Sequence, residues 1–205
     1  RANLGRANLG WANLERANEI AEEFGIVVIE DGAQSFGATV NGRKSCSLTK
    51  IASTSFFPAK PFGCYGDGGA LFTSDDSLCE TMKMIRNHGG ARRHHHTIVG
   101  MNGRFDTIQA ATLLAKLPHF QGEVELRKTL GRRYNELLGD VYTVPTPGGG
   151  RTHVYGQYTI RVQERERFIA SMKEDEIPTA VYYPKCLHEQ PVFAKLGYER
   201  GSFPH

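Results

Sequence analysis

The sequence predicts an α/β fold, because the spacing of apolar residues changes repeatedly between strand-like and helix-like along the chain. Ile26–Ile29 is a short, uninterrupted apolar run of the kind that forms a buried parallel strand. Leu78, Met82 and Ile85 recur at helical spacing and give one apolar face to a segment that follows another strand-like run. Together these patterns indicate a mostly parallel sheet with flanking helices.

The N-terminal segment repeats a five-residue unit, RANLG RANLG WANLE RANEI, over the first 20 residues. A pentapeptide-repeat solenoid needs several stacked coils, and these units supply material for one coil at most. We therefore interpret residues 1–23 as a low-complexity leader that runs into a helix over Leu14–Phe24, which Gly25 ends. A structural pentapeptide-repeat protein remains an alternative.

Further elements follow in chain order, and the first group forms a larger domain over residues 24–118. Strands are expected at Ser53–Phe57 and Ala70–Thr73, and helices at Asp76–Asn87, Asp106–Lys116 and Gln121–Leu138. The Pro- and Gly-rich run Val144–Gly150 then breaks the pattern. Beyond it we expect a strand at Val154–Val162, a helix at Glu164–Glu174 and a strand at Thr179–Tyr183. Residues 119–205 are accordingly interpreted as a linking helix and an incomplete small α+β domain.

Composition excludes several classes of protein. The hydrophobic and charged fractions, 40% and 23%, are those of a globular chain. A net charge of +3 gives no indication of nucleic-acid binding, and no apolar run approaches the roughly 18–20 residues of a membrane span. No apolar signal core follows Arg1 and Arg6, so we expect a cytoplasmic protein with no nucleic-acid or membrane partner.

Cysteine and histidine patterns do not indicate a metal site. The four cysteines form no CxxC pair and match no zinc motif, which favours free thiols. His94, His95 and His96 are consecutive, so their side chains diverge instead of converging on one ion. With Arg92 and Arg93 they are a better candidate for a phosphate-contacting loop or for a solvated one.

Four polar residues near the predicted strand ends have the chemistry that pyridoxal phosphate requires. Asp31 follows a strand and can hold the pyridine nitrogen protonated, and Lys60 lies in an aromatic, glycine-rich turn that favours a nucleophilic amine. Gln34 can meet the ring oxygen and Ser55 the phosphate. Gly63–Gly69 allows the backbone to approach a cofactor closely. By spacing alone, an ordinary strand–loop–strand edge is the favoured interpretation, because single Asp and Lys residues are common.

Longer motifs resemble one known family. The segments EDGAQSFGA, TSFFPAKPFGCYGDGGALFTSDD, RNHG, NGRFDTIQAA and YYPKCLHEQPVF resemble the DegT/DnrJ/EryC1/StrS aminotransferases over most of the chain. The resemblance implies a partial fold-type I large domain, pyridoxal phosphate as cofactor, and amino transfer from glutamate to a nucleotide-linked keto sugar in surface polysaccharide synthesis. The sequence of the second motif is most similar to that of the branch that acts on UDP-2-acetamido-3-oxo-glucuronate.

The same resemblance assigns roles to individual residues. Lys60 would be the Schiff-base lysine, and its presence favours transamination over the dehydratase branch, which has histidine there. Asp31, Gln34 and Ser55 would contact the pyridine nitrogen, the ring and the phosphate respectively. Asn102 would reach the phosphate of a neighbouring subunit, which implies a homodimer with its active site at the interface.

Three more residues would contact the substrate. Arg104 could hold a sugar carboxylate, although pairing with Asp106 or Glu123 is an alternative. Tyr182 and Tyr183 match substrate-contacting positions, but they could equally be structural, and the branch has histidine before the tyrosine. Because family members are far longer, we expect the chain to be truncated at both ends. A non-catalytic fragment that acts only through subunit association is the main alternative function.

Overall fold

The computed structural model describes residues 13–203, and the chain divides into two compact units, residues 1–161 and 162–205. The RANLG units at positions 1–12 lie outside the described residues. The expected first helix is confirmed as α1, Leu14–Glu23, with the Asn13 side chain accepting a hydrogen bond from the Arg16 N–H as its N-cap. Between residues 13 and 203, no helix combines the length and apolar character needed to cross a membrane.

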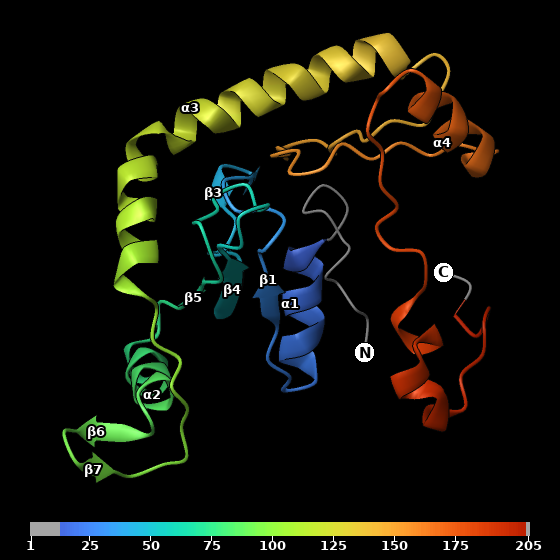
Figure 1. Ribbon diagram of the computed structural model, residues 1–205. Helices are drawn as coiled ribbons and strands as arrows, with labels where there is room; N and C mark the ends of the chain where they lie inside the picture. Colours follow the sequence, from blue (N-terminus) through green and yellow to red (C-terminus); the bar gives the residue numbers. More distant parts are fainter. Residues whose placement is uncertain (1–12, 204–205) are drawn as a thin grey trace. The chain divides into compact units, whose positions relative to one another are not determined.

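The main sheet has the order β1–β4–β5, with β1 at Ile29–Asp31, β4 at Ile51–Ser55 and β5 at Gly69–Phe72 (Figure 1). The β1 and β4 strands run parallel, whereas β5 runs antiparallel to β4. The sheet is therefore mixed and small, where the sequence had predicted a mostly parallel one. The connection between β4 and β5 contains no helix that could carry the chain back to the start of a parallel strand, so β5 returns antiparallel to β4.

The position and burial of the first strand also differ from the prediction. The strand was expected at Ile26–Ile29, but β1 begins only at Ile29. Ile26 lies before it and donates its N–H to the carbonyl of Ala21 near the end of α1. Ile26, Val27 and Ile29 are 64%, 58% and 61% exposed, so the expectation of a buried apolar strand was wrong for these side chains. The described sheet has no further strand beyond β1 that would cover them.

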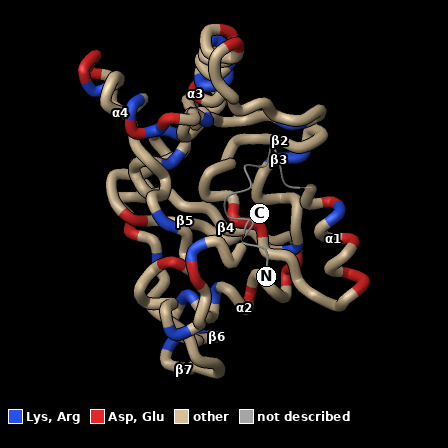
Figure 2. The backbone as a smooth tube through the Cα atoms, turned by 90° about the vertical axis from the view of Figure 1, so that its right-hand side faces the viewer, with Lys and Arg blue, Asp and Glu red and all other residues tan. Residues whose placement is uncertain are grey.

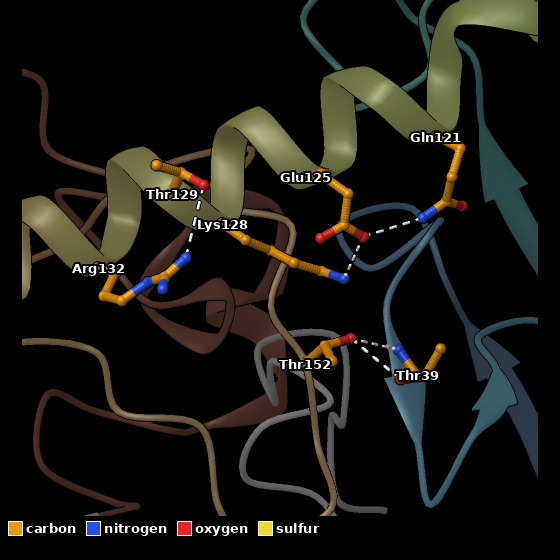
Figure 3. Close-up of polar contacts among 7 residues, drawn as sticks. All are labelled: Thr39, Gln121, Glu125, Lys128, Thr129, Arg132 and Thr152. Carbon is orange, nitrogen blue, oxygen red and sulfur yellow. Dashed lines mark hydrogen bonds and ion pairs between the residues drawn. The ribbon is translucent and has the colours of Figure 1, made fainter.

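Two hairpins extend the first unit. The strands β2 (Thr39–Val40) and β3 (Arg43–Lys44) pair antiparallel, as do β6 (Gly90–Arg92) and β7 (His95–His96). Thr152 reaches β2, where its hydroxyl accepts from the Thr39 N–H at 2.8 Å and lies 3.1 Å from the Thr39 hydroxyl (Figure 3). Within the first unit, this contact joins the segment after the Pro- and Gly-rich break to β2.

Two helices follow the sheet, α2 at Asp76–Arg86 and α3 at Thr107–Leu138. Asp75 caps α2 by accepting from the Leu78 N–H. The prediction of two helices over residues 106–138 was wrong, because α3 continues through Pro118. Proline removes one hydrogen bond and bends a helix without necessarily ending it, and Figure 1 shows α3 bent.

Two hydrophobic clusters form the core, and α3 contributes to both. Its buried Val124 packs in a cluster with Leu14, Ala38, Val40, Leu48 and Val154. Its buried Leu113 packs with Phe56, Phe62 and Cys64. Phe120 contacts both clusters, and its ring centroid lies 4.6 Å from that of Phe62. The helix thus joins the sheet-edge turn after β4 to the rest of the first unit.

The second unit contains α4 (Arg165–Glu174) and the 3-10 helices η2 (Leu187–Glu189) and η3 (Pro191–Leu196). The helix expected at Glu164–Glu174 is confirmed. The strands expected at Val154–Val162 and Thr179–Tyr183 were wrong, since neither segment forms a ladder beyond the isolated bridge between Thr143 and Arg161. A strand-like sequence becomes a strand only where a partner strand satisfies its backbone groups.

Glu30 is the buried acid of the first strand, at 3% exposure. Its carboxyl group accepts from the Ser45 hydroxyl at 3.0 Å, the Cys46 N–H at 2.7 Å and the Leu48 N–H at 3.3 Å. These bonds attach β1 to the loop over residues 45–48. In the same loop, burial raises the pKa of the Cys46 thiol to about 11.

Replacing Glu30 with alanine leaves these buried donors without an acceptor. We expect Glu30→Ala to lower the free energy of unfolding by about 2–4 kcal/mol, measured by urea denaturation. Glu136→Ala, at an exposed position of α3, is the control and should change it by less than about 0.5 kcal/mol. Equal losses in both variants would contradict the role of Glu30.

His153 gives the fold a pH dependence. It is 7% exposed, its Nδ1 accepts from the Tyr155 N–H at 2.8 Å, and burial lowers its pKa below the ordinary 6.5. The unfolded chain therefore binds a proton at a higher pH than the folded chain. The stabilising effect is complete above pH 6.5 and is lost as the pH falls from there toward the folded pKa.

We expect the free energy of unfolding to decrease below pH 6.5 by up to about 1.4 kcal/mol per pH unit from this group. His153→Gln has no imidazole to protonate, so its denaturation midpoint should depend less on pH between about 7.5 and 5.5. Parallel pH profiles for the two proteins would show that His153 does not titrate as described.

Candidate active site

The parallel register brings two predicted site residues to one edge of the sheet. Asp31 ends β1 and is aligned with Ser53 of β4, and Ser55 ends β4 two residues later. Beyond the last pair, the Gly32 N–H bonds to the Ser53 carbonyl at 2.7 Å and the Thr54 hydroxyl bonds to the Gly32 carbonyl at 3.2 Å. These bonds extend the strand pairing past Asp31, so the carboxyl ends of both strands lie together.

Local turns hold the polar side chains at this edge. One carboxyl oxygen of Asp31 accepts from the Ala33 N–H at 3.0 Å, and the Ser55 hydroxyl accepts from the Phe57 N–H at 3.2 Å. Asp31 is exposed, unlike its neighbour Glu30. Gln34 is half-buried, with its amide oxygen 3.4 Å from the position that a Cβ at Gly156 would take. Each of these groups can therefore meet a ligand at the sheet edge.

Lys60 lies in a tight turn that directly follows β4. Its N–H bonds to the Phe57 carbonyl at 2.9 Å, and the Cys64 N–H returns to the Phe56 carbonyl at 2.8 Å. A Cβ at Gly63 would lie 2.7 Å from the carbonyl oxygens of Phe57 and Pro58, so only glycine fits there. The turn has the aromatic and glycine-rich character that the sequence indicated, and Lys60 itself is half-buried.

Sequence reasoning missed three further contacts to the segment between β4 and β5, two from the first half of α3 and one from a residue just before it. The Gln109 amide oxygen accepts from the Tyr65 N–H at 2.9 Å, and the Lys116 ammonium donates to the Gly63 carbonyl. The ring of Phe105, just before the helix, occupies the space that a Cβ at Gly68 would need. The helical spacing of residues 109 and 116 was a visible signal, but the pattern did not show what the helix faced.

Asn102 and Arg104 contact each other in the segment between β7 and α3. The Arg104 Nε donates to the Asn102 amide oxygen at 2.9 Å, and no ion pair joins Arg104 to Asp106 or Glu123 within residues 13–203. Both side chains are exposed. Because Nε is the atom used, the two terminal nitrogens of the guanidinium remain available for an anion.

The remaining candidates are exposed. Tyr182 and Tyr183 belong to the second unit, with ring centroids 5.6 Å apart. His95 and His96 form β7 in a basic hairpin with Arg92 (Figure 2). Over the described range, no group of three or more His, Cys, Asp or Glu side chains is arranged to hold a metal ion.

Comparison with known proteins identifies close relatives. The chain is 50% identical over 178 residues to a UDP-2-acetamido-2-deoxy-3-oxo-D-glucuronate aminotransferase from Pseudomonas aeruginosa, covering 86% of this chain and 50% of that protein. It is 46% identical to a pleiotropic regulatory protein from Geobacillus stearothermophilus, covering 90% of this chain and 51% of that one.

Solved structures agree with these sequence matches. DesV from S. venezuelae, crystallised with a ketimine intermediate, matches with a TM-score of 0.90 and 32% identity over 94% of this chain and 53% of its own. A DegT DnrJ EryC1 StrS aminotransferase from Brucella abortus matches with a TM-score of 0.87 and 41% identity over 89% of this chain and 49% of its own.

The chain spans about half the length of the curated relatives that it matches. The model of the DegT/DnrJ/EryC1/StrS aminotransferase family matches residues 10–205, nearly the whole sequence. On this match, together with the sequence and structural relatives, the chain belongs to the DegT/DnrJ/EryC1/StrS aminotransferase family.

Proposed function

We propose that this chain carries the cofactor-binding residues of a pyridoxal-phosphate-dependent aminotransferase that acts on a nucleotide-linked keto sugar, with glutamate as the amino donor. The observation that carries the proposal is the meeting of Asp31, Ser55 and the Lys60 turn at one sheet edge. An amine, a carboxyl group and a hydroxyl group there are the donor set that the cofactor requires. The residues present therefore fit this group.

When bound, the cofactor supplies an electron sink for the bonds around the amino-bearing carbon. Lys60 would provide the amine that holds the cofactor and would move a proton at the reacting carbon. Asp31 would keep the pyridine nitrogen protonated, and the Ala33 N–H orients that carboxyl group. Ser55 would donate to the phosphate, and Gln34 would lie beside the ring.

The proposed substrate is an anionic sugar nucleotide. The Pseudomonas aeruginosa relative is named for a 3-oxo-glucuronate, which bears a carboxylate. The terminal nitrogens of Arg104 suit such a group in a forked geometry, and Tyr182 and Tyr183 are proposed further contacts. Such a reaction would serve surface polysaccharide synthesis in the cytoplasm. Asn102 is proposed to reach the phosphate held by a second subunit of a homodimer.

Exposed apolar residues favour a second candidate, in which the chain acts without catalysis by associating with other subunits. Ile26, Val27 and Ile29 at the first strand and Leu71 on β5 are all more than half exposed. A strand at a sheet edge presents unpaired backbone groups as well as these side chains. Attachment of the cofactor to Lys60 distinguishes the two candidates.

The first test is covalent capture of the cofactor. Adding pyridoxal phosphate should give a visible absorption band from its imine with Lys60. Borohydride should then abolish this band and leave a pyridoxyl group on Lys60, which peptide mass spectrometry identifies. Lys60→Ala should abolish the label. Lys50→Ala, which removes a lysine paired with Asp75 at 3.2 Å on the surface, should retain it. A chain that takes no label on Lys60 would favour the non-catalytic candidate.

The second test concerns the acid. Asp31→Asn removes the charge that holds the ring nitrogen protonated, so conversion of the bound cofactor by glutamate should slow by about 100-fold or more. Stopped-flow spectroscopy of this single half-reaction measures the effect. Asp140→Asn, an exposed substitution after α3, serves as the control. A rate unchanged in Asp31→Asn would remove Asp31 from the site.

A further inference from the structure

We infer that Gln109 and Lys116 of α3 are positioning residues that hold the turn bearing Lys60 in its reactive geometry. The inference rests on the proposed function, because it concerns the amine that would hold the cofactor. Neither side chain needs to touch cofactor or substrate for this role. Both act through the backbone of the turn between β4 and β5.

The two contacts are made to neighbouring peptide groups. Gln109 accepts from the Tyr65 N–H at 2.9 Å, and Lys116 donates to the Gly63 carbonyl. Between them lies Cys64, whose thiol donates to the Phe56 carbonyl at 3.0 Å. Tyr65 as a whole is 81% exposed, so its backbone N–H is hydrogen-bonded to α3 although the residue itself is not packed. The end of the Lys60 turn is therefore bonded to the helix on both sides of Cys64.

One face of α3 contacts this turn along its length. Gln109 and Lys116 are separated by about two helical turns and so lie on the same side. Leu113 lies between them and is buried against Phe56, Phe62 and Cys64. An apolar side chain at position 116 would extend this packing without the cost of desolvating an ammonium group. The charged residue is accordingly better explained by its bond to the carbonyl than by packing.

The geometry of the turn transmits these contacts to Lys60. Gly63 fits against the carbonyls of Phe57 and Pro58 with no space for a Cβ, and the Lys60 N–H is bonded to Phe57. Residues 57–63 therefore form a closed unit in which movement of the Gly63 carbonyl moves Lys60. Displacing a reacting group by about 1 Å can cost about 100-fold in rate, so anchoring of this unit matters for an amine that must meet a cofactor.

The test compares Gln109→Leu and Lys116→Met with the conservative Lys116→Arg and with a control on the same helix, Lys128→Met. Lys128 pairs with Glu125 at 2.8 Å (Figure 3). It lies about three helical turns beyond Lys116 on α3. Three quantities are measured on the full chain: the melting temperature, amide hydrogen exchange over residues 57–66 without cofactor, and the apparent dissociation constant for pyridoxal phosphate from the visible band that depends on Lys60.

Gln109→Leu and Lys116→Met should melt near the parent temperature, while exchange of the turn amides and the dissociation constant each rise about tenfold. In Lys116→Arg, the exchange rate and the dissociation constant should stay close to their parent values. Lys128→Met should change neither quantity. Unchanged exchange and affinity in Gln109→Leu and Lys116→Met, with the parent labelled on Lys60, would overturn this inference alone. A large fall in melting temperature would assign a structural role and overturn it too. A parent that takes no label would overturn the proposed function and this inference with it.

Discussion

The parallel pairing of β1 with β4 is the constraint on which the candidate site depends. It aligns Asp31 with Ser53, and so sets an acid and the hydroxyl of Ser55 at the same sheet edge. Side chains alternate between the two faces of a strand, so a slip of one residue would turn Asp31 away and bring Glu30 into its place. The three hydrogen bonds to buried Glu30 oppose that slip, because it would withdraw their acceptor.

The helix α3 is the second support of the site. Its 32 residues contribute Leu113 to the cluster beneath the Lys60 turn and Val124 to the cluster around Leu14 and Val154. Pro118 bends the helix between these two positions without ending it. A single element thus fixes the turn to the rest of the unit, and this continuity allows polar residues on the same helix to set the backbone of the turn.

The exposed apolar residues, taken with the family relationship, bear on the choice between the two proposed functions. Ile26, Val27 and Ile29 are exposed around a strand that has β4 as its partner in the described sheet. Relatives that match this chain along most of its length have about as much sequence again. Edge strands and apolar faces of this kind are the surfaces through which chains associate, which is why catalysis and subunit association both remain functions to be tested.

The sequence by itself determined the family, the helices α1, α2 and α4, and the residue types of the candidate site, because helical spacing, capping residues and motif order are local properties. Tertiary structure alone decided that β5 is antiparallel, that residues 107–138 form one helix, and that Glu30 is buried while Asp31 is exposed. It also decided that Gln109 and Lys116 face the Lys60 turn. These outcomes depend on which distant segments supply hydrogen-bond partners and cover apolar surface, and no pattern within one segment contains that information.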